Sequence, residues 1–179
     1  MKVILFSGIP GTGKSTLSEE ITRILHIPVF SLDWILGAML LSQLRVQQEG
    51  FYVTTAEALL TILIQRQLML GQSAILDTPA NTVAQRKRWQ DLAQSYNAEF
   101  YGLETICSDM ELHRRRVEGR KRGIPGWHDT VNWNHVERMR HQSETWTDHE
   151  GEHLTIDAVH PLNENVQAIL KYVQLENNS

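Results

Sequence analysis

Near its start the chain reads Gly8-Ile9-Pro10-Gly11-Thr12-Gly13-Lys14-Ser15-Thr16. Gly8 to Ser15 fit the pattern G-x-x-x-x-G-K-[ST], whose glycines let the backbone turn tightly and point successive N–H groups at anionic oxygens. The lysine of this pattern reaches the β- and γ-phosphates of a nucleotide, and the serine hydroxyl can hold Mg²⁺. The stretch predicts a phosphate-binding loop formed by Gly8, Pro10, Gly11, Thr12, Gly13, Lys14, Ser15 and Thr16.

The residues on both sides of the loop support this interpretation. The apolar segment 1–6 is typical of a short strand. Apolar residues recur at helical spacing after the loop, at Leu17, Ile21, Ile24 and Leu25. The pattern occurs between a strand and a helix. The helix is needed because its N-terminus adds its positive end to the anion site. The alternative is a glycine-rich turn without a ligand.

Length and composition set limits on the protein class. The chain has 179 residues, which suits one domain over 1–179, and a net charge of −4, which argues against a dedicated nucleic-acid binder. Cys107 is the only cysteine, so an internal disulfide is impossible and a reducing cytoplasm is the expected location. We expect Cys107 to be a small core residue. No apolar stretch is long enough to span a bilayer, and we expect no membrane association.

Strand and helix patterns alternate along the chain. The expected strands lie at 1–6, 27–31, 73–76, 100–107 and 153–156. Besides the helix after the loop, the expected helices lie at 34–48, 54–70, 82–96, 110–122, 131–147 and 163–174. This series predicts an α/β fold with a parallel sheet covered on both faces. Ligands of such sheets bind beyond the carboxyl ends of the strands.

Acidic residues follow three of the expected strands. Asp77 ends the third strand, where a carboxylate can support Mg²⁺ together with Ser15, although it could instead cap the next helix. Asp33 follows the second strand, where a carboxylate can accept the proton of an attacking hydroxyl. A helix cap is again the alternative. We expect Asp157 to be structural or to lie near the nucleotide base.

A basic segment at 113–122 carries five arginines. Arg116 and Arg120 are four residues apart, so on one helix they would share a face and could clamp phosphate groups. We expect Arg114, Arg115 and Lys121 to form a solvated face. The glycine-rich residues 123–126 predict a flap, and we expect a lid at about 114–130 that excludes water from bound nucleotide. His128 on this lid is either a functional residue or an exposed one.

At these residues the chain resembles the small P-loop kinases, and most closely the compact AAA-domain-type kinases of bacteria. The group includes nucleoside-monophosphate-type, gluconate and shikimate kinases, antibiotic phosphotransferases and the kinase domain of polynucleotide kinases. The matching segments are the loop, Ser31-Leu32-Asp33, Ile75-Leu76-Asp77-Thr78 and Arg116-Val117-Glu118-Gly119-Arg120. The resemblance implies a P-loop NTPase three-layer sandwich with a five-stranded parallel sheet of order 2-3-1-4-5 and a helical lid. It also implies that Arg86 lies on the substrate side.

One departure from this group concerns the acceptor. Relatives that act on phosphorylated or nucleic-acid substrates often have an arginine about three residues after the acid, where this chain has Leu36. Trp34, Leu36 and Met39 therefore predict an uncharged, partly apolar acceptor, unless they pack into the core.

The leading hypothesis is an ATP-dependent kinase that transfers the γ-phosphoryl group to a hydroxyl of a small-molecule acceptor. Its expected cofactors are ATP and Mg²⁺, with Ser15 and Asp77 at the metal. The expected catalytic residues are Lys14, Asp33, Arg116 and Arg120, and the expected substrate residues are Asp33, Trp34 and Arg86. A second hypothesis replaces the acceptor by the 5′-hydroxyl of a polynucleotide, guided by the basic residues 86–88. A third is a non-catalytic ATP-binding module that acts through a partner.

Overall fold

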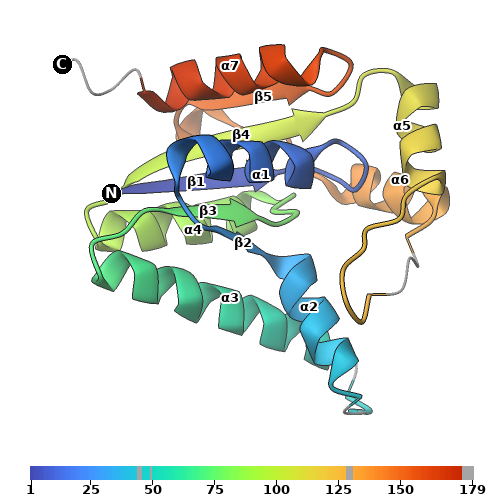
Figure 1. Cartoon of the computed structure of the whole chain (residues 1–179), viewed down its shortest axis with the longest axis horizontal. Coiled ribbons are helices and arrows are strands. Elements are labelled where there is room, and N and C mark those ends of the chain that lie inside the picture. The colour runs from blue at the N-terminus through green and yellow to red at the C-terminus, as the bar shows by residue number, and fades with distance from the viewer. Residues whose placement is uncertain (44–45, 49, 128–130, 175–179) are drawn as a thin grey trace.

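The computed structural model describes residues 1–43, 46–48, 50–127 and 131–174. Five parallel strands in this part of the chain form one sheet of order β2-β3-β1-β4-β5 (Figure 1). They are β1 (Lys2–Ser7), β2 (Val29–Ser31), β3 (Ala74–Asp77), β4 (Glu99–Ile106) and β5 (His153–Asp157). The order predicted from the sequence is confirmed, and every strand pair is parallel in register.

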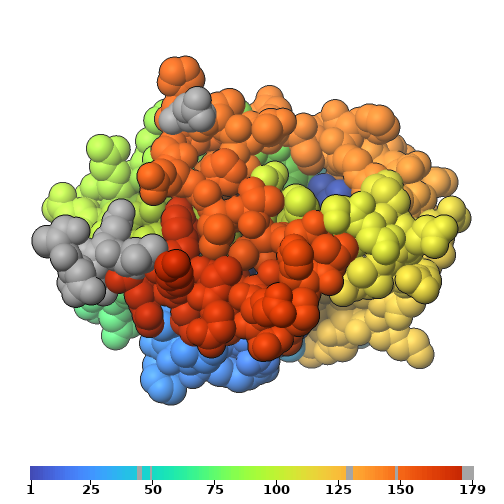
Figure 2. Space-filling view, turned by 90° about the horizontal axis from the view of Figure 1, so that it is seen from above, coloured from blue at the N-terminus to red at the C-terminus, as the bar shows by residue number. Residues whose placement is uncertain are grey.

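Helices cover both faces of the sheet. Helices α1 (Lys14–Leu25) and α7 (Leu162–Gln174) lie on one face, and α3 (Phe51–Met69) and α4 (Val83–Ser95) lie on the other (Figure 1). Seen from above, α7 in red forms the top of the molecule (Figure 2). The chain is thus a three-layer α/β sandwich.

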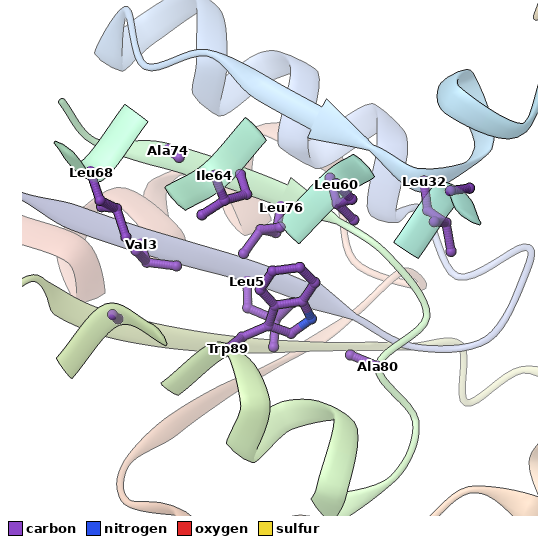
Figure 3. Packing of buried hydrophobic residues seen from close by; sticks show 12 residues of the cluster. Val3, Leu5, Leu32, Leu60, Ile64, Leu68, Ala74, Leu76, Ala80 and Trp89 are labelled. Atoms are coloured by element: carbon purple, nitrogen blue, oxygen red, sulfur yellow. The ribbon is translucent and has the colours of Figure 1, made fainter. Parts of the chain in front are cut away.

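The central strand β1 has no solvent-facing side, which explains its continuous apolar run. Val3 and Leu5 pack with Leu60 and Ile64 of α3 and with Trp89 of α4 (Figure 3). The alternate residues of β1 pack in a second core with α1 and α7. Both cores form because a parallel sheet buries both of its faces.

Helices α2 (Leu32–Leu41), α5 (Met110–Glu118) and α6 (Trp133–Gln142) lie near the carboxyl ends of the strands (Figure 1). The short 3₁₀ helix η1 (Asp148–Glu150) precedes β5 and contacts α4. Among the described helices, none has both the length and the apolar character needed to cross a membrane.

Three helices end several residues earlier than the sequence predicts. Helix α2, expected to reach residue 48, ends at Leu41. Helix α5 ends at Glu118, with Gly119 as its C-cap, so Arg120 follows the helix and does not share a helical face with Arg116. Glycine has a low helix propensity, which explains the early stop. Helix α6 ends at Gln142, and Ser143 is extended. The backbone N–H of Glu144 then donates to the Asn81 carbonyl at 2.8 Å, which ties this segment to the start of α4.

Candidate functional site

The loop between β1 and α1 has the geometry of an anion-binding nest. Gly8 and Gly11 have φ angles of 130° and 90°, which side chains of L-residues rarely adopt. A Cβ at Gly8 would lie 2.3 Å from the Thr105 carbonyl oxygen, so the loop also needs glycine for space. The Thr12 hydroxyl lies 2.8 Å from the Ile9 carbonyl oxygen and 2.7 Å from the Thr105 hydroxyl. These contacts fix the conformation of the loop and tie it to Thr105 of β4.

Lys14 lies at the first position of α1 and points back over the loop. Its Nζ donates to the Ile9 carbonyl oxygen at 3.1 Å. The pKa of Lys14 is lowered to about 8, mainly by burial; the Asp77 carboxylate raises it, and the guanidinium groups of Arg120 and Arg122 contribute to the lowering. Because anions favour the charged form of a lysine, a bound polyphosphate would raise this pKa again.

Ser15 and Asp77 meet where the loop lies over the end of β3. The Ser15 hydroxyl donates to Asp77 Oδ2 at 2.8 Å, and Asp77 is almost fully buried. The hydroxyl and carboxylate oxygens form a donor set that suits Mg²⁺, which prefers oxygen ligands. Asp77 does not cap α4, because the N-cap of that helix is Thr82, which forms a capping box with Gln85.

Asp33 lies in the first turn of α2, and the N-cap position of that helix is Ser31. The Asp33 carboxylate forms an ion pair with Arg122. Nη2 of Arg122 also donates to the Ser15 hydroxyl at 3.2 Å, and its guanidinium lies 5.4 Å from the centre of the Trp127 ring. Only 7% of the Arg122 side chain is exposed. One guanidinium thus connects the loop, α2 and the segment after α5.

Sequence reasoning missed this role of Arg122. The residue stands at the end of the arginine-rich segment, but its spacing from Arg116 does not distinguish it. The available signal was its place beside the glycine-rich residues 123–126, where the chain can turn back toward the loop. Its contacts depend on α2, whose position a local pattern does not reveal.

The segment after α5 packs closely on α2. A Cβ at Gly37 would lie 2.6 Å from Ile124 Cγ2, and one at Gly126 would lie 2.3 Å from the Gly37 carbonyl oxygen. Ile124 is buried in this contact. Residues 122–126 of the expected lid therefore lie against α2, while His128 falls outside the described residues. The lid boundaries stay a prediction.

A cleft of about 510 Å³ opens beside the loop. Trp34 lines it and is 51% exposed, whereas Leu36 and Met39 pack against the core, as the alternative interpretation of these two residues requires. The predicted cationic residues Arg116 and Arg120 also line it. The remaining lining residues come mainly from the loop, α1 and the connection between β5 and α7, and include Gly11, Gly13, Ser15, Thr16, Ala158, His160 and Asn165.

Asp157 joins the segment after β4 to the segment after β5, next to Ala158, which lines this cleft. Its Oδ1 accepts from the backbone N–H groups of Ser108 at 3.1 Å and Val159 at 3.2 Å. Burial raises the pKa of Asp157, but these hydrogen bonds outweigh that effect and hold the pKa below its usual value. The residue therefore has a structural role, one of the two expected from the sequence.

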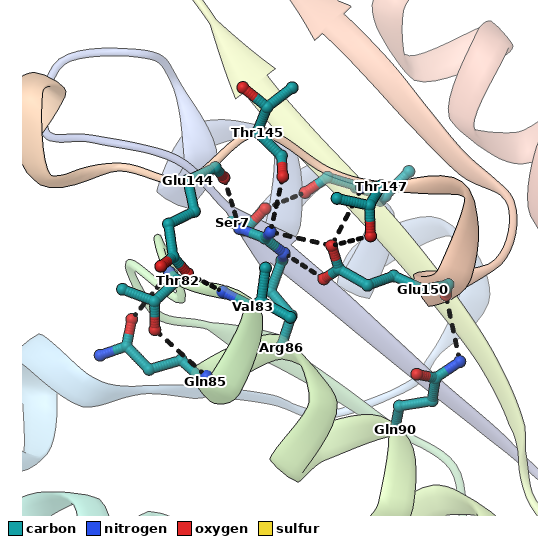
Figure 4. A network of polar contacts seen from close by, with 11 residues as sticks. Ser7, Thr82, Val83, Gln85, Arg86, Gln90, Glu144, Thr145, Thr147 and Glu150 are labelled. Carbon is teal, nitrogen blue, oxygen red and sulfur yellow. Dashed lines mark hydrogen bonds and ion pairs between the residues drawn. The ribbon is translucent and has the colours of Figure 1, made fainter.

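Arg86 is placed elsewhere than the resemblance implies. Its guanidinium is buried and binds Glu150 through two hydrogen bonds, of 2.6 and 3.0 Å (Figure 4). It also donates to the carbonyl oxygens of Glu144 and Thr145, so all three guanidinium nitrogens are bonded within the protein. Arg86 borders a second cavity behind the loop and is absent from the lining of the cleft beside Trp34. We therefore do not carry it into the acceptor site.

Comparisons with known proteins place this site in a family. The model of the AAA domain family matches residues 3–145, which is most of the chain. The chain belongs to the AAA domain family. No curated protein matches it.

Solved structures share the fold of this AAA-domain chain. A candidate kinase from Chloroflexus aurantiacus J-10-fl has a TM-score of 0.72 at 21% identity and covers 97% of this chain and 98% of its own. Kti12 from Chaetomium thermophilum in complex with ADP-AlF3 has a TM-score of 0.70 at 14% identity, covering 96% and 98%. A gluconokinase from Sinorhizobium meliloti 1021 has a TM-score of 0.68 at 16% identity, covering 99% and 94%. The chain thus has the fold of the small P-loop kinases.

A buried histidine supports the loop of this AAA domain from α5. Because a carbonyl oxygen can only accept, His113 Nε2 donates to the Pro10 carbonyl at 2.8 Å. Nδ1 then carries no proton and accepts from Arg140 Nη2 at 3.1 Å. The Trp133 ring packs edge-on at 5.3 Å. Burial lowers the pKa of His113, the Pro10 bond raises it, and the charges of Arg140, Lys14 and Arg116 lower it. One donating and one accepting ring nitrogen match the neutral imidazole, and the lowered pKa favours that form.

We expect this histidine to make stability depend on pH. Its folded pKa lies below the ordinary value of 6.5, so the unfolded chain binds the proton first as pH falls. The free energy of unfolding should therefore decline as pH falls from about 7.5 to about 5. The variant His113→Gln keeps one donor and one acceptor without titrating, and should show a flatter profile in denaturant titrations. The variant of exposed His141→Gln is the control, and profiles of equal slope for all three proteins would contradict the expectation.

Proposed function

We propose that the chain is an ATP-dependent kinase that transfers the γ-phosphoryl group to a hydroxyl of a small-molecule acceptor. The carrying observation is that Arg122 contacts both the Ser15 hydroxyl and the Asp33 carboxylate. Asp33, the only acidic residue of α2, is therefore separated from Ser15 of the phosphate-binding loop by a single guanidinium group. A proton acceptor beside a phosphate site is what transfer to a hydroxyl requires.

Each residue of the site has a role in this proposal. Lys14 and the loop N–H groups hold the β- and γ-phosphates of ATP. Ser15 and Asp77 would hold Mg²⁺, which neutralises phosphate charge when bound. Asp33 orients the acceptor hydroxyl and takes its proton. Arg116 and Arg120 neutralise the charge of the transferring group. Catalysis then depends on positioning and electrostatics.

The charges near α4 favour a small acceptor over a polynucleotide. Lys87 pairs with Asp91 at 2.9 Å, and Arg88 lies 3.7 Å from Glu57. Together with the buried Arg86, the basic residues expected to guide a nucleic acid thus have acidic partners. The exposed Trp34 offers an apolar surface instead. A structurally similar protein is a gluconokinase, and another is in complex with ADP-AlF3, which supports a small hydroxyl compound and a nucleotide as substrates.

A transfer screen tests the proposal. Purified protein is incubated with γ-labelled ATP, Mg²⁺ and a panel of sugars, polyols, amino alcohols, hydroxylated aromatic compounds and 5′-hydroxyl oligonucleotides. The proposal expects transfer of label to one class of small hydroxyl compound, with little change between low and high salt. Labelling of oligonucleotides that falls steeply as the salt concentration rises would favour the hypothesis of a polynucleotide acceptor. Tight binding of Mg·ATP without any transfer would favour the non-catalytic module.

Arg122 should compete with the metal for Ser15. A guanidinium and a divalent cation repel each other, so both cannot stay close to the same hydroxyl. We expect the variant Arg122→Gln to reach half-maximal nucleotide binding at a Mg²⁺ concentration several-fold lower than wild type. This change corresponds to the loss of about 1 kcal/mol of repulsion between the guanidinium and the metal ion. The measurement is the fluorescence of a labelled ATP analogue titrated with Mg²⁺. The variant Lys121→Gln removes the same charge from the neighbouring residue, and an equal shift in this control would show a non-specific charge effect.

A further inference from the structure

Helix α3 carries large apolar side chains on the face that points away from the sheet. Its inner face buries Ala56, Leu60, Ile64 and Leu68. Its outer face and its C-cap residue Leu70 expose five large apolar residues, which we call the α3 stripe: Leu59, Ile62, Leu63, Met69 and Leu70. Each is between 42% and 61% exposed. Figure 1 shows α3 as the outermost helix along the lower edge of the molecule. Surface helices normally carry polar residues on such a face, so the α3 stripe needs an explanation.

One charged residue, Arg66, interrupts the otherwise apolar α3 stripe. Together with Arg66, its members recur at the three- and four-residue spacing that places side chains on one helical face. Arg66 is the only charged residue among them. A helix that lies on a membrane surface needs several basic residues beside its apolar face, and this one has a single arginine. The composition instead resembles the contact face between two protein helices.

The exposed area of the α3 stripe, taken with the adjoining end of α2, is sufficient for a dimer. At about 180 Å² for a fully exposed residue of this size, the exposed fractions of the five residues leave about 460 Å². Two copies of the α3 stripe would then bury about 900 Å², just below the lower limit of about 1,000 Å² for a specific interface. Leu40 and Leu41, at the end of α2, are 40% and 58% exposed, and α2 packs on α3, so burial of these two residues as well takes the area past that limit.

We propose that the α3 stripe is the interface of a homodimer, in which two copies of α3 pack antiparallel about a two-fold axis near Ile62. A two-fold axis makes one apolar stripe complementary to itself. With the axis at this residue, Arg66 of each chain lies opposite the small Ala58 of its partner. The Arg66 stem then covers apolar surface while its guanidinium reaches solvent at the rim. The cleft beside the loop is built from other elements, and the interface leaves it open.

The mass of the protein in solution tests this proposal. Sedimentation velocity at about 50 µM should give twice the chain mass of 20.6 kDa for wild type. The variant Ile62→Glu should give the chain mass, because it places two carboxylates next to each other at the axis. The control Ile24→Glu changes an isoleucine of α1 that is 46% exposed, and should stay dimeric. A monomeric wild type, or a dimer that survives Ile62→Glu, overturns the proposal.

A cross-link gives a second readout that does not depend on the folding of a charged variant. The only native cysteine, Cys107, is buried, so it contributes little background. On mild oxidation the variant Ile62→Cys should form a disulfide-linked dimer, with the two thiols losing their hydrogens to the added oxidant. The control Ile24→Cys should not. Equal cross-linking of both variants, or of neither, would contradict an axis at Ile62. None of these results depends on kinase activity.

Discussion

The variant Asp33→Asn is expected to lower the rate of phosphoryl transfer by about 10²–10⁴, the usual contribution of a positioned general base. Asparagine has the same shape and can still accept a hydrogen bond from Arg122, but it cannot take the proton of the acceptor hydroxyl. The first turn of α2 and its contact with the segment after α5 should be kept. Affinity for Mg·ATP should therefore change by less than about threefold. The measurements are kcat for the acceptor found in the screen and the Kd for nucleotide.

A control variant separates loss of the base from loss of charge. Glu19 lines the cleft beside the loop, and its carboxylate is 3.5 Å from Arg23, so Glu19→Gln removes an equal charge without touching the proposed proton acceptor. This control should keep kcat within about twofold. Transfer that continues at the wild-type rate in Asp33→Asn would show that another group, or water, takes the proton.

The fold was predictable because one motif anchors it. The loop after the first strand fixes where β1 ends and α1 begins, and the apolar runs that follow give the other strands. The errors concern helix ends. Gly119 stops α5 before Arg120, and the chain leaves α6 after Gln142 to reach the start of α4. In the second case a tertiary contact decides the boundary, and no local pattern reports it.

Some residues of the candidate site could be predicted from local sequence patterns, whereas others depend on tertiary contacts. Lys14, Ser15 and Asp77 could be placed from the sequence because each lies at a strand end or within the loop. The residues that the sequence did not place act through distant partners. Arg122 and Ser15 are 107 residues apart, and His113 and Pro10 are 103 residues apart. A pattern along the chain predicts which residues share a helix or an edge of the sheet. It does not predict which long side chains cross between elements.

The largest effect on stability is expected from the variant Arg86→Met, which leaves Glu150 buried without its cation. The Arg86 and Glu150 side chains are 3% and 5% exposed, and the guanidinium also stacks on Trp146 at 4.7 Å. Removing one partner of a buried ion pair typically costs about 3–5 kcal/mol, because the remaining charge is neither paired nor hydrated. For a domain of this size that loss lowers Tm by about 6–20 °C. Thermal unfolding followed by circular dichroism measures it.

The neighbouring residue and the partner residue provide the controls for this prediction. Lys87→Met removes an exposed cation from the same helix and should change stability by less than about 0.5 kcal/mol. The double variant Arg86→Met with Glu150→Met should recover part of the loss, since it removes both charges from the interior. If Arg86→Met were as stable as wild type and instead raised the KM for the acceptor, Arg86 would belong to the substrate site, as the family resemblance implies. The four bonds of its guanidinium to Glu150, Glu144 and Thr145 lead us to expect the loss of stability.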